Sequence, residues 1–79
     1  MDNVEDRLAR CFATLFPDLN QPEIRRASID SVAGWDSVAT VTLINLVEEE
    51  FGVQVGLEDV EELLSFEEFR AYLEERVQV

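Results

Sequence analysis

The chain has 79 residues, which suits one small domain, and 47% of them are hydrophobic, as in globular proteins. It holds 18 acidic residues against 6 arginines, with no lysine or histidine, so its net charge at pH 7 is -12. This charge disfavours nucleic acid and anionic membranes as partners, because both are bound through lysine and arginine, and it favours proteins with basic patches.

The N-terminal segment is acidic and lacks the apolar core of a signal peptide, and no apolar run has membrane-spanning length. We therefore expect a cytoplasmic protein without membrane insertion. The chain begins at Met1 without a tag or linker, which favours a free-standing protein over a module of a larger one. We expect a monomer with a single domain over residues 1–79. A single cysteine and no histidine exclude an internal disulfide and a metal site built from those residue types.

The first helix is expected from about Asn3 to Phe16, with Asp2 or Asn3 as the N-cap and Pro17 as its end. Apolar residues recur along it at helical spacing and form one face. Cys11 belongs to this face, so we expect a buried thiol and not a reactive one. The members of the face are Val4, Leu8, Cys11, Phe12 and Leu15.

A long connection follows, over residues 17–36, and its content of Asp, Asn, Ser, Pro and Gly indicates mostly irregular structure. Connections of this length are unusual in a compact domain and are often functional. There is room for a short helical turn around residues 23–27. Four apolar residues are expected to hold the connection against the core: Leu19, Ile24, Ile29 and Val32.

The second long helix is expected from Ser37 to Phe51, with Gly52 as the residue that ends it. Its core seam is formed by Leu43, Val47 and Phe51, which are four residues apart. Val38 and Val41 lie away from this seam, at the N-terminal end of the helix. They belong either to a broad buried stripe or to a docking surface for a partner.

The remaining chain predicts a short helix over Glu58–Leu63 and a last helix over Phe66–Val77. Ser65 and Glu68 have the spacing of a capping box at the start of the last helix. Its buried stripe is expected to consist of Phe66, Phe69, Tyr72 and Leu73. The fold class is therefore all-α, with three main helices, one short helix and a long loop between the first two main helices.

The serine at the start of the second main helix is the candidate functional residue. Ser37 follows a loop and opens a helix, so an anion attached to its hydroxyl would lie at the positive end of the helix dipole. Without histidine or lysine the chain has no conventional base to activate this hydroxyl. A presented but unactivated serine indicates a residue that another enzyme modifies. The alternative is that the Asp36-Ser37 pair simply caps the helix.

In these segments the chain resembles the acyl carrier proteins, which are four-helix domains that bear phosphopantetheine. The resemblance extends over essentially the whole chain, and the pairing of Asp-Ser with a later Glu-Glu-x-Phe is its most specific part. The matching text is Gly34-Trp35-Asp36-Ser37-Val38, Thr40-Val41, Leu43, Val47-Glu48-Glu49-Glu50-Phe51-Gly52-Val53-Gln54-Val55, and the Ser65-Phe66, Phe69 and Tyr72-Leu73 positions. An acyl-carrier-like four-helix bundle is the fold that this resemblance implies.

The resemblance implies that a phosphopantetheinyl transferase attaches 4'-phosphopantetheine from coenzyme A to Ser37, and that Asp36 helps that enzyme hold magnesium. The arm would carry acyl or related intermediates as thioesters to acyl-loading and acyl-processing enzymes that have basic docking patches. The carrier itself would not be an enzyme. Four residues are implied for the partner contacts, two of them apolar and two acidic: Val38, Val41, Glu48 and Glu49.

Several positions differ from what is common in the family. Val38 is shorter than the usual leucine or methionine, and Trp35 is bulky where small residues are common. Ala39 and Thr42 stand where carriers of fatty-acid synthesis are commonly acidic. These differences favour a specialised lipid, polyketide or nonribosomal pathway over bulk fatty-acid synthesis.

Two other functions compete with the carrier. The first is an unmodified acidic module of the same fold that binds a basic partner through its second main helix. The second is a stand-alone enzyme, which the absence of histidine and lysine and the small size of the domain disfavour.

Overall fold

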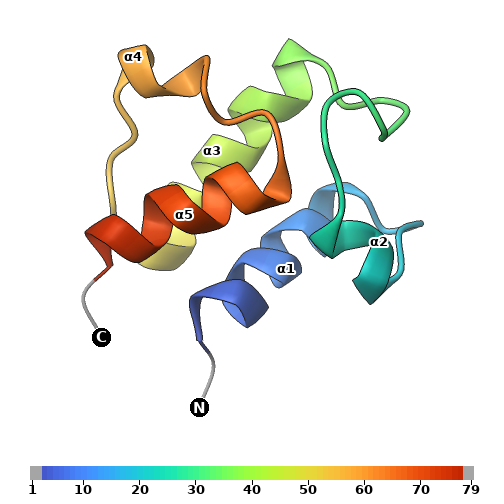
Figure 1. Cartoon of the computed structure of the whole chain (residues 1–79). Coiled ribbons are helices and arrows are strands. Elements are labelled where there is room, and N and C mark those ends of the chain that lie inside the picture. Colours follow the sequence, from blue (N-terminus) through green and yellow to red (C-terminus); the bar gives the residue numbers. More distant parts are fainter. Residues whose placement is uncertain (1–2, 78–79) are drawn as a thin grey trace.

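The computed structural model describes residues 3–77, and within this range the chain forms five helices and no strand (Figure 1). An antiparallel bridge joins Ser28 to Ser65. The all-α fold predicted from the sequence is confirmed. The helices are α1 Val4–Leu15, α2 Gln21–Arg25, α3 Ser37–Phe51, α4 Leu57–Val60 and α5 Phe66–Arg76.

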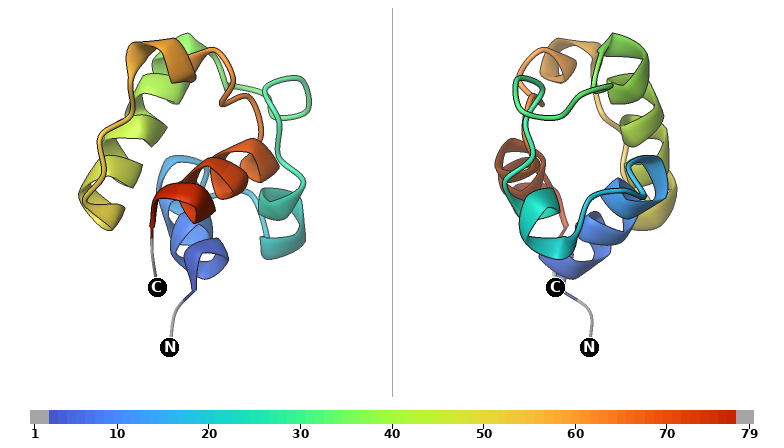
Figure 2. Two further views of the ribbon diagram at one scale, coloured as in Figure 1. Left: turned by 60° about the vertical axis from the view of Figure 1, so that its left-hand side comes forward. Right: turned by 90° about the vertical axis from the view of Figure 1, so that its right-hand side faces the viewer.

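The three long helices form the body of the domain. Helix α1 packs against both α3 and α5, and the short α2 packs against α1 and α5. The short α4 lies beside the N-terminal half of α3, at the end of the molecule where the 17–36 connection enters α3 (Figures 1 and 2). The start of α3 is therefore an accessible end of the bundle, bordered by a loop and a short helix.

Helix α1 matches its prediction to within one residue at each end. Asn3 is its N-cap, and Asn3 Oδ1 accepts a hydrogen bond from the N–H of Asp6 at 2.8 Å. The alternative cap, Asp2, lies outside the described residues. Phe12 is completely buried and Cys11 is buried, as the apolar face predicted.

The connection between α1 and α3 contains a true helix, α2, which begins two residues earlier than the turn expected around residues 23–27. A capping box places it there. Asn20 Oδ1 accepts from the N–H of Glu23 at 2.9 Å, and Glu23 Oε1 accepts from the N–H of Asn20 at 2.9 Å. Pro22 lies in the first turn, where proline favours helix formation. The Asn-x-x-Glu spacing with a proline in the first turn is the sequence signal for this helix.

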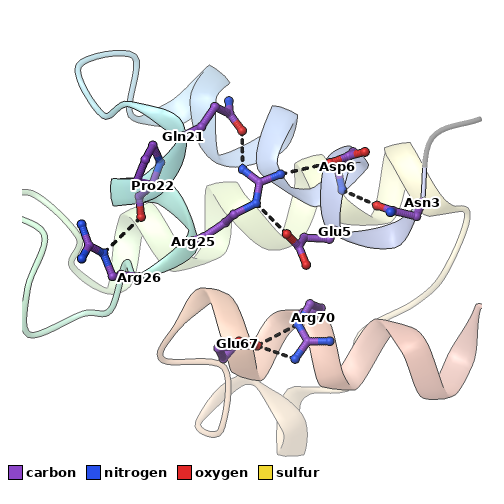
Figure 3. A network of polar contacts seen from close by, with 9 residues as sticks. All are labelled: Asn3, Glu5, Asp6, Gln21, Pro22, Arg25, Arg26, Glu67 and Arg70. Carbon is purple, nitrogen blue, oxygen red and sulfur yellow. Dashed lines mark hydrogen bonds and ion pairs between the residues drawn. The ribbon is translucent and has the colours of Figure 1, made fainter.

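Helix α2 is fixed to α1 from two sides. On its inner side Ile24 is completely buried. Leu19, Ile29 and Val32, which lie in the connection outside α2, are only partly buried against the core. On its outer side Arg25 forms ion pairs with Glu5 Oε2 at 2.6 Å and Asp6 Oδ1 at 3.0 Å (Figure 3). The connection is therefore held in place over its first half, before it reaches α3.

An aromatic cluster fills the centre of the bundle. The centroid of the Phe12 ring lies 5.4 Å from that of the Trp35 ring, 5.2 Å from that of Phe66 and 5.7 Å from that of Phe69, in each case edge to face. Such pairs add to the gain from burial alone. Tyr72, which was predicted to share the buried stripe of α5, is only half-buried. Its hydroxyl instead bonds to the Asp59 carboxylate at 2.9 Å, at the edge of the core.

The short helix differs most from its prediction. Helix α4 begins at Leu57 and ends at Val60, although Glu58–Leu63 was expected. The chain leaves the helix early because Leu63 turns into the core, where it is 1% exposed, and the carbonyl of Leu64 accepts a hydrogen bond from the N–H of Ile29 at 2.9 Å. Contacts with the 17–36 connection thus override the local helical preference. Helix α5 ends at Arg76, one residue before the predicted end.

Candidate functional site

The junction at residues 35–40 presents Ser37 at the surface. Asp36, and not the serine, is the N-cap of α3, because Asp36 Oδ1 accepts from the N–H of Ala39 at 2.9 Å. Ser37 is the first residue of the helix and is exposed. Within residues 3–77 the Ser37 hydroxyl forms no hydrogen bond, so the capping expected of the Asp36-Ser37 pair is performed by Asp36 and does not involve the serine side chain.

The start of α3 is suited to an anion bonded to Ser37. The N–H groups of Ala39 and Thr40 are used by Asp36, through its carboxylate and its carbonyl. The N–H groups of Ser37 and Val38 have no acceptor among the described residues. Free amides and the helix dipole together favour negative charge at this position, so an anionic group bonded to the Ser37 hydroxyl would be stabilised here.

Behind Ser37 the backbone is anchored by a residue that sequence reasoning did not assign to the site. Trp35 is only 4% exposed, and its indole N–H donates to Oγ1 of Thr40 at 2.8 Å. The Thr40 hydroxyl in turn donates to the carbonyl oxygen of Asp36 at 3.1 Å. No local pattern pointed to this pair, because it depends on the burial of the indole between α1 and α5.

The predicted apolar contacts lie on the same end of α3. Val38 is 72% exposed and Val41 is 54% exposed, so the structure places both outside the core and excludes the broad buried stripe. A third exposed apolar residue, Leu57 at the start of α4, is 88% exposed and was not predicted. Its signal in the sequence was weak, because a lone leucine before an acidic run is equally typical of a buried helix face.

The two predicted acidic contacts differ in their surroundings. Glu49 is exposed, whereas Glu48 is half-buried and its Oε2 accepts from the N–H of Val55 at 2.9 Å, which ties the α3–α4 linker to α3. Both carboxylates line an open hollow of ≈ 860 Å³ together with Asn45 and residues 53–56. With a rise of about 1.5 Å per residue, they lie roughly 16–18 Å from Ser37 along the helix axis.

The structure therefore spreads the six predicted site residues along α3 and does not gather them in one cleft. Asp36, Ser37 and Val38 are at its start, Val41 is one turn further, and the acidic pair is near its end. Such an arrangement can present a modified serine beside an elongated contact surface. Across residues 3–77 no three side chains of the metal-ligating types converge, and none of the helices has the length and apolar character needed to cross a bilayer.

The thiol of Cys11 is chemically quiet. Burial, with a smaller contribution from the Glu50 carboxylate, raises its pKa to about 11. The thiol therefore stays protonated at neutral pH, and at pH 8 its thiolate fraction is about a hundredfold lower than that of an ordinary cysteine. The buried-hydrophobe interpretation of Cys11 agrees with this environment.

This gives a prediction for thiol titration. We expect the native chain to react with Ellman's reagent at pH 8 far more slowly than the unfolded chain, which should release one equivalent of thiolate at once. A phosphopantetheine arm would add one fast-reacting thiol. Fast reaction of the native, unmodified chain would contradict the burial of Cys11 and remove the basis of this assay.

The family model described as "Phosphopantetheine attachment site" matches residues 6–73, which include all five helices in whole or in part. A comparison with curated proteins found no match.

Proposed function

The chain belongs to the phosphopantetheine-attachment family, and from this membership we propose that Ser37 is the attachment residue and that the protein carries acyl or related groups as thioesters. A phosphopantetheine carrier role and a phosphopantetheine prosthetic group follow from the family, whose carrier domains are not catalytic. The assignment to Ser37 is supported chiefly by its exposed, unbonded hydroxyl beside the two free amides of Ser37 and Val38.

The attachment step is a phosphoryl-type transfer to the serine hydroxyl. Oγ of Ser37 attacks the phosphorus of coenzyme A that bears the pantetheine arm, and a new O–P bond forms. The P–O bond to the nucleotide breaks, so that adenosine 3',5'-bisphosphate leaves with the electron pair. The serine proton passes to a base of the transferase, since the chain has no histidine or lysine to accept it. Asp36 has one carboxylate oxygen outside its capping bond, and we propose that it assists with magnesium there.

After attachment, the thiol at the end of the arm supplies the group that holds the cargo. The protein's own residues hold the phosphodiester at the start of α3 and present the neighbouring apolar side chains of Val38 and Val41 to partner enzymes. Tethering raises the effective concentration of the cargo at a docked active site. We propose acyl-loading and acyl-processing enzymes with basic docking patches as the partners, in a specialised lipid, polyketide or nonribosomal pathway in the cytoplasm.

Intact-protein mass spectrometry tests the proposal. The chain is incubated with coenzyme A, magnesium and a broad-specificity phosphopantetheinyl transferase, and peptide fragmentation then locates the adduct. We expect one phosphopantetheine increment, on the peptide that contains Ser37. No increment on the folded chain, with a known carrier modified in the same tube, would favour the unmodified acidic interaction module. An increment on Ser28, Ser31 or Ser65 would contradict the assigned residue.

Charge reversal on α3 gives a separate prediction about docking. We expect Glu49→Lys to slow transfer to a partner with a basic patch at low ionic strength, and to leave the free energy of unfolding within about 0.5 kcal/mol, because its side chain is exposed. Glu48→Lys should slow transfer and also lose stability, by about 1–3 kcal/mol, because the Val55 N–H loses its acceptor. Transfer kinetics are compared at low and high salt, where docking effects should fade.

The matched control for this experiment is Glu75→Lys, which reverses an exposed charge on α5, away from α3. It should behave as wild type in both assays. If all variants transferred at the same rate at low salt, the acidic residues of α3 would not belong to the docking surface.

A further inference from the structure

We propose that Trp35 and Thr40 form a lock on the turn that presents Ser37, and that both act as positioning residues for its modification. The inference rests on the proposed function. The Trp35–Thr40 lock consists of two consecutive hydrogen bonds, from the Trp35 indole N–H to Thr40 Oγ1 at 2.8 Å and from the Thr40 hydroxyl to the Asp36 carbonyl at 3.1 Å. Together they close a ring across the loop-to-helix junction.

One side of the lock is fixed by the core. The centroid of the Trp35 ring lies 5.4 Å from that of the Phe12 ring, 5.9 Å from that of Phe16 and 6.4 Å from that of Phe69. These neighbours belong to α1, to the residue that follows it and to α5, so the indole has no room to rotate independently of the bundle. The Trp35 side chain therefore connects the loop side of the junction to the centre of the domain.

The other side of the lock is the first turn of α3. Thr40 is a polar residue that is only 5% exposed. Within residues 3–77 it is the one residue of the polar or charged types that is buried. Its hydroxyl uses both of its capacities, accepting from the indole and donating to Asp36. A buried polar group without a partner would be unfavourable, so each member of the lock requires the other.

Within residues 3–77 the Ser37 side chain forms no hydrogen bond that would set its orientation. The residue is exposed, it follows the anchored Trp35 and Asp36, and the chain is buried again two residues later, at Ala39 and then Thr40. The lock therefore fixes the backbone on both sides of the serine while leaving its hydroxyl free. In a group-transfer reaction a displacement of about 1 Å can lower the rate about a hundredfold, so the position of this backbone is significant for the attacking oxygen.

The arrangement is more specific than an ordinary threonine bond to the preceding helical turn. Thr42 Oγ1 donates to the Val38 carbonyl at 3.1 Å, and Thr14 Oγ1 donates to the Arg10 carbonyl at 3.0 Å. Neither hydroxyl accepts from an indole. These two threonines supply matched controls, because substitution to valine removes the same local bond without touching the lock.

The first test measures kcat/KM for transfer of phosphopantetheine from coenzyme A to the carrier chain, well below the unfolding temperature of each variant. Trp35→Phe and Thr40→Val should each lower kcat/KM by about tenfold. The double variant should be no slower than the slower single variant, because both substitutions break the same connection. Thr40→Ser, which keeps the hydroxyl, should recover most of the rate. Thr42→Val and Thr14→Val should remain within about twofold of wild type.

The second test does not depend on any transferase. Amide hydrogen exchange is followed by NMR at Ala39, whose N–H donates to the Asp36 cap, and at Glu68, whose N–H donates to the equivalent Ser65 cap of α5. In Thr40→Val the exchange of the Ala39 amide should become about tenfold faster, and that of Glu68 should not change. The comparison separates loosening of this junction from a general loss of stability.

The two tests have distinct failures. Absence of modification on wild type would overturn the proposed function and the positioning role, whereas the exchange experiment would still judge the lock itself. Unchanged exchange at Ala39 would overturn the lock. Faster exchange with an unchanged rate of transfer would overturn the positioning role, and so would additive losses in the double variant or equal losses in the valine controls.

Discussion

Ser37→Ala is expected to abolish attachment of phosphopantetheine and to leave the fold intact. The Ser37 side chain is exposed and forms no hydrogen bond within residues 3–77, and the cap of α3 is supplied by Asp36. Removing the hydroxyl should therefore change the free energy of unfolding by less than about 0.5 kcal/mol. The mass increment is measured under the same conditions for wild type and variant, and stability is measured by urea denaturation.

Ser65→Ala is the control that should show the opposite pattern. Ser65 Oγ accepts from the N–H of Glu68 at 3.1 Å as the cap of α5, so its loss should cost about 0.5–2 kcal/mol of stability. The Ser65→Ala variant should still be modified completely, at Ser37. An increment on Ser37→Ala would place the arm on another residue, and unfolding of Ser37→Ala would show that this serine has a structural role that the exposed side chain does not reveal.

Phe12→Ala should be the most damaging change to the fold. The Phe12 ring is 0% exposed and contacts the rings of Trp35, Phe66 and Phe69. Truncation of such a residue costs about 3–5 kcal/mol, through lost burial and an unfilled cavity. A domain of this length has a free energy of unfolding of only about 4–12 kcal/mol, so the variant should be largely or partly unfolded at 37 °C.

Urea denaturation followed by circular dichroism and by the fluorescence of Trp35, the single tryptophan, measures this effect. Val38→Ala serves as the control, because the 72% exposed Val38 side chain should contribute less than about 0.5 kcal/mol to stability. A loss below about 1 kcal/mol for Phe12→Ala would mean that the neighbouring rings close the cavity, and that the aromatic cluster is less rigid than its packing indicates.

Much of the fold could be predicted from local signals. Helix α3 begins at Ser37 and ends at Phe51 as expected, because an aspartate cap and a glycine at φ 68° mark its ends. The ends of α4 could not be predicted from the local sequence. They depend on the burial of Leu63 in the core and on the hydrogen bond between Ile29 and Leu64, two residues that are far apart in the sequence. The spacing of apolar residues predicts which face of a helix is buried, but it does not predict which distant segment of the chain packs against that face.

The candidate site shows the same division. By itself the sequence determined the helix start at Ser37, the absence of an activating base and the acidic charge, because these follow from composition and from spacing within one helix. It left Val38 and Val41 open between a buried stripe and an exposed surface, and the structure decided for the surface. Only the tertiary structure decided that Trp35 is buried and bonded to Thr40, and that Glu48 holds the Val55 N–H. Those contacts arise where separate segments pack together, and a hydrogen-bond partner is fixed only once that packing exists.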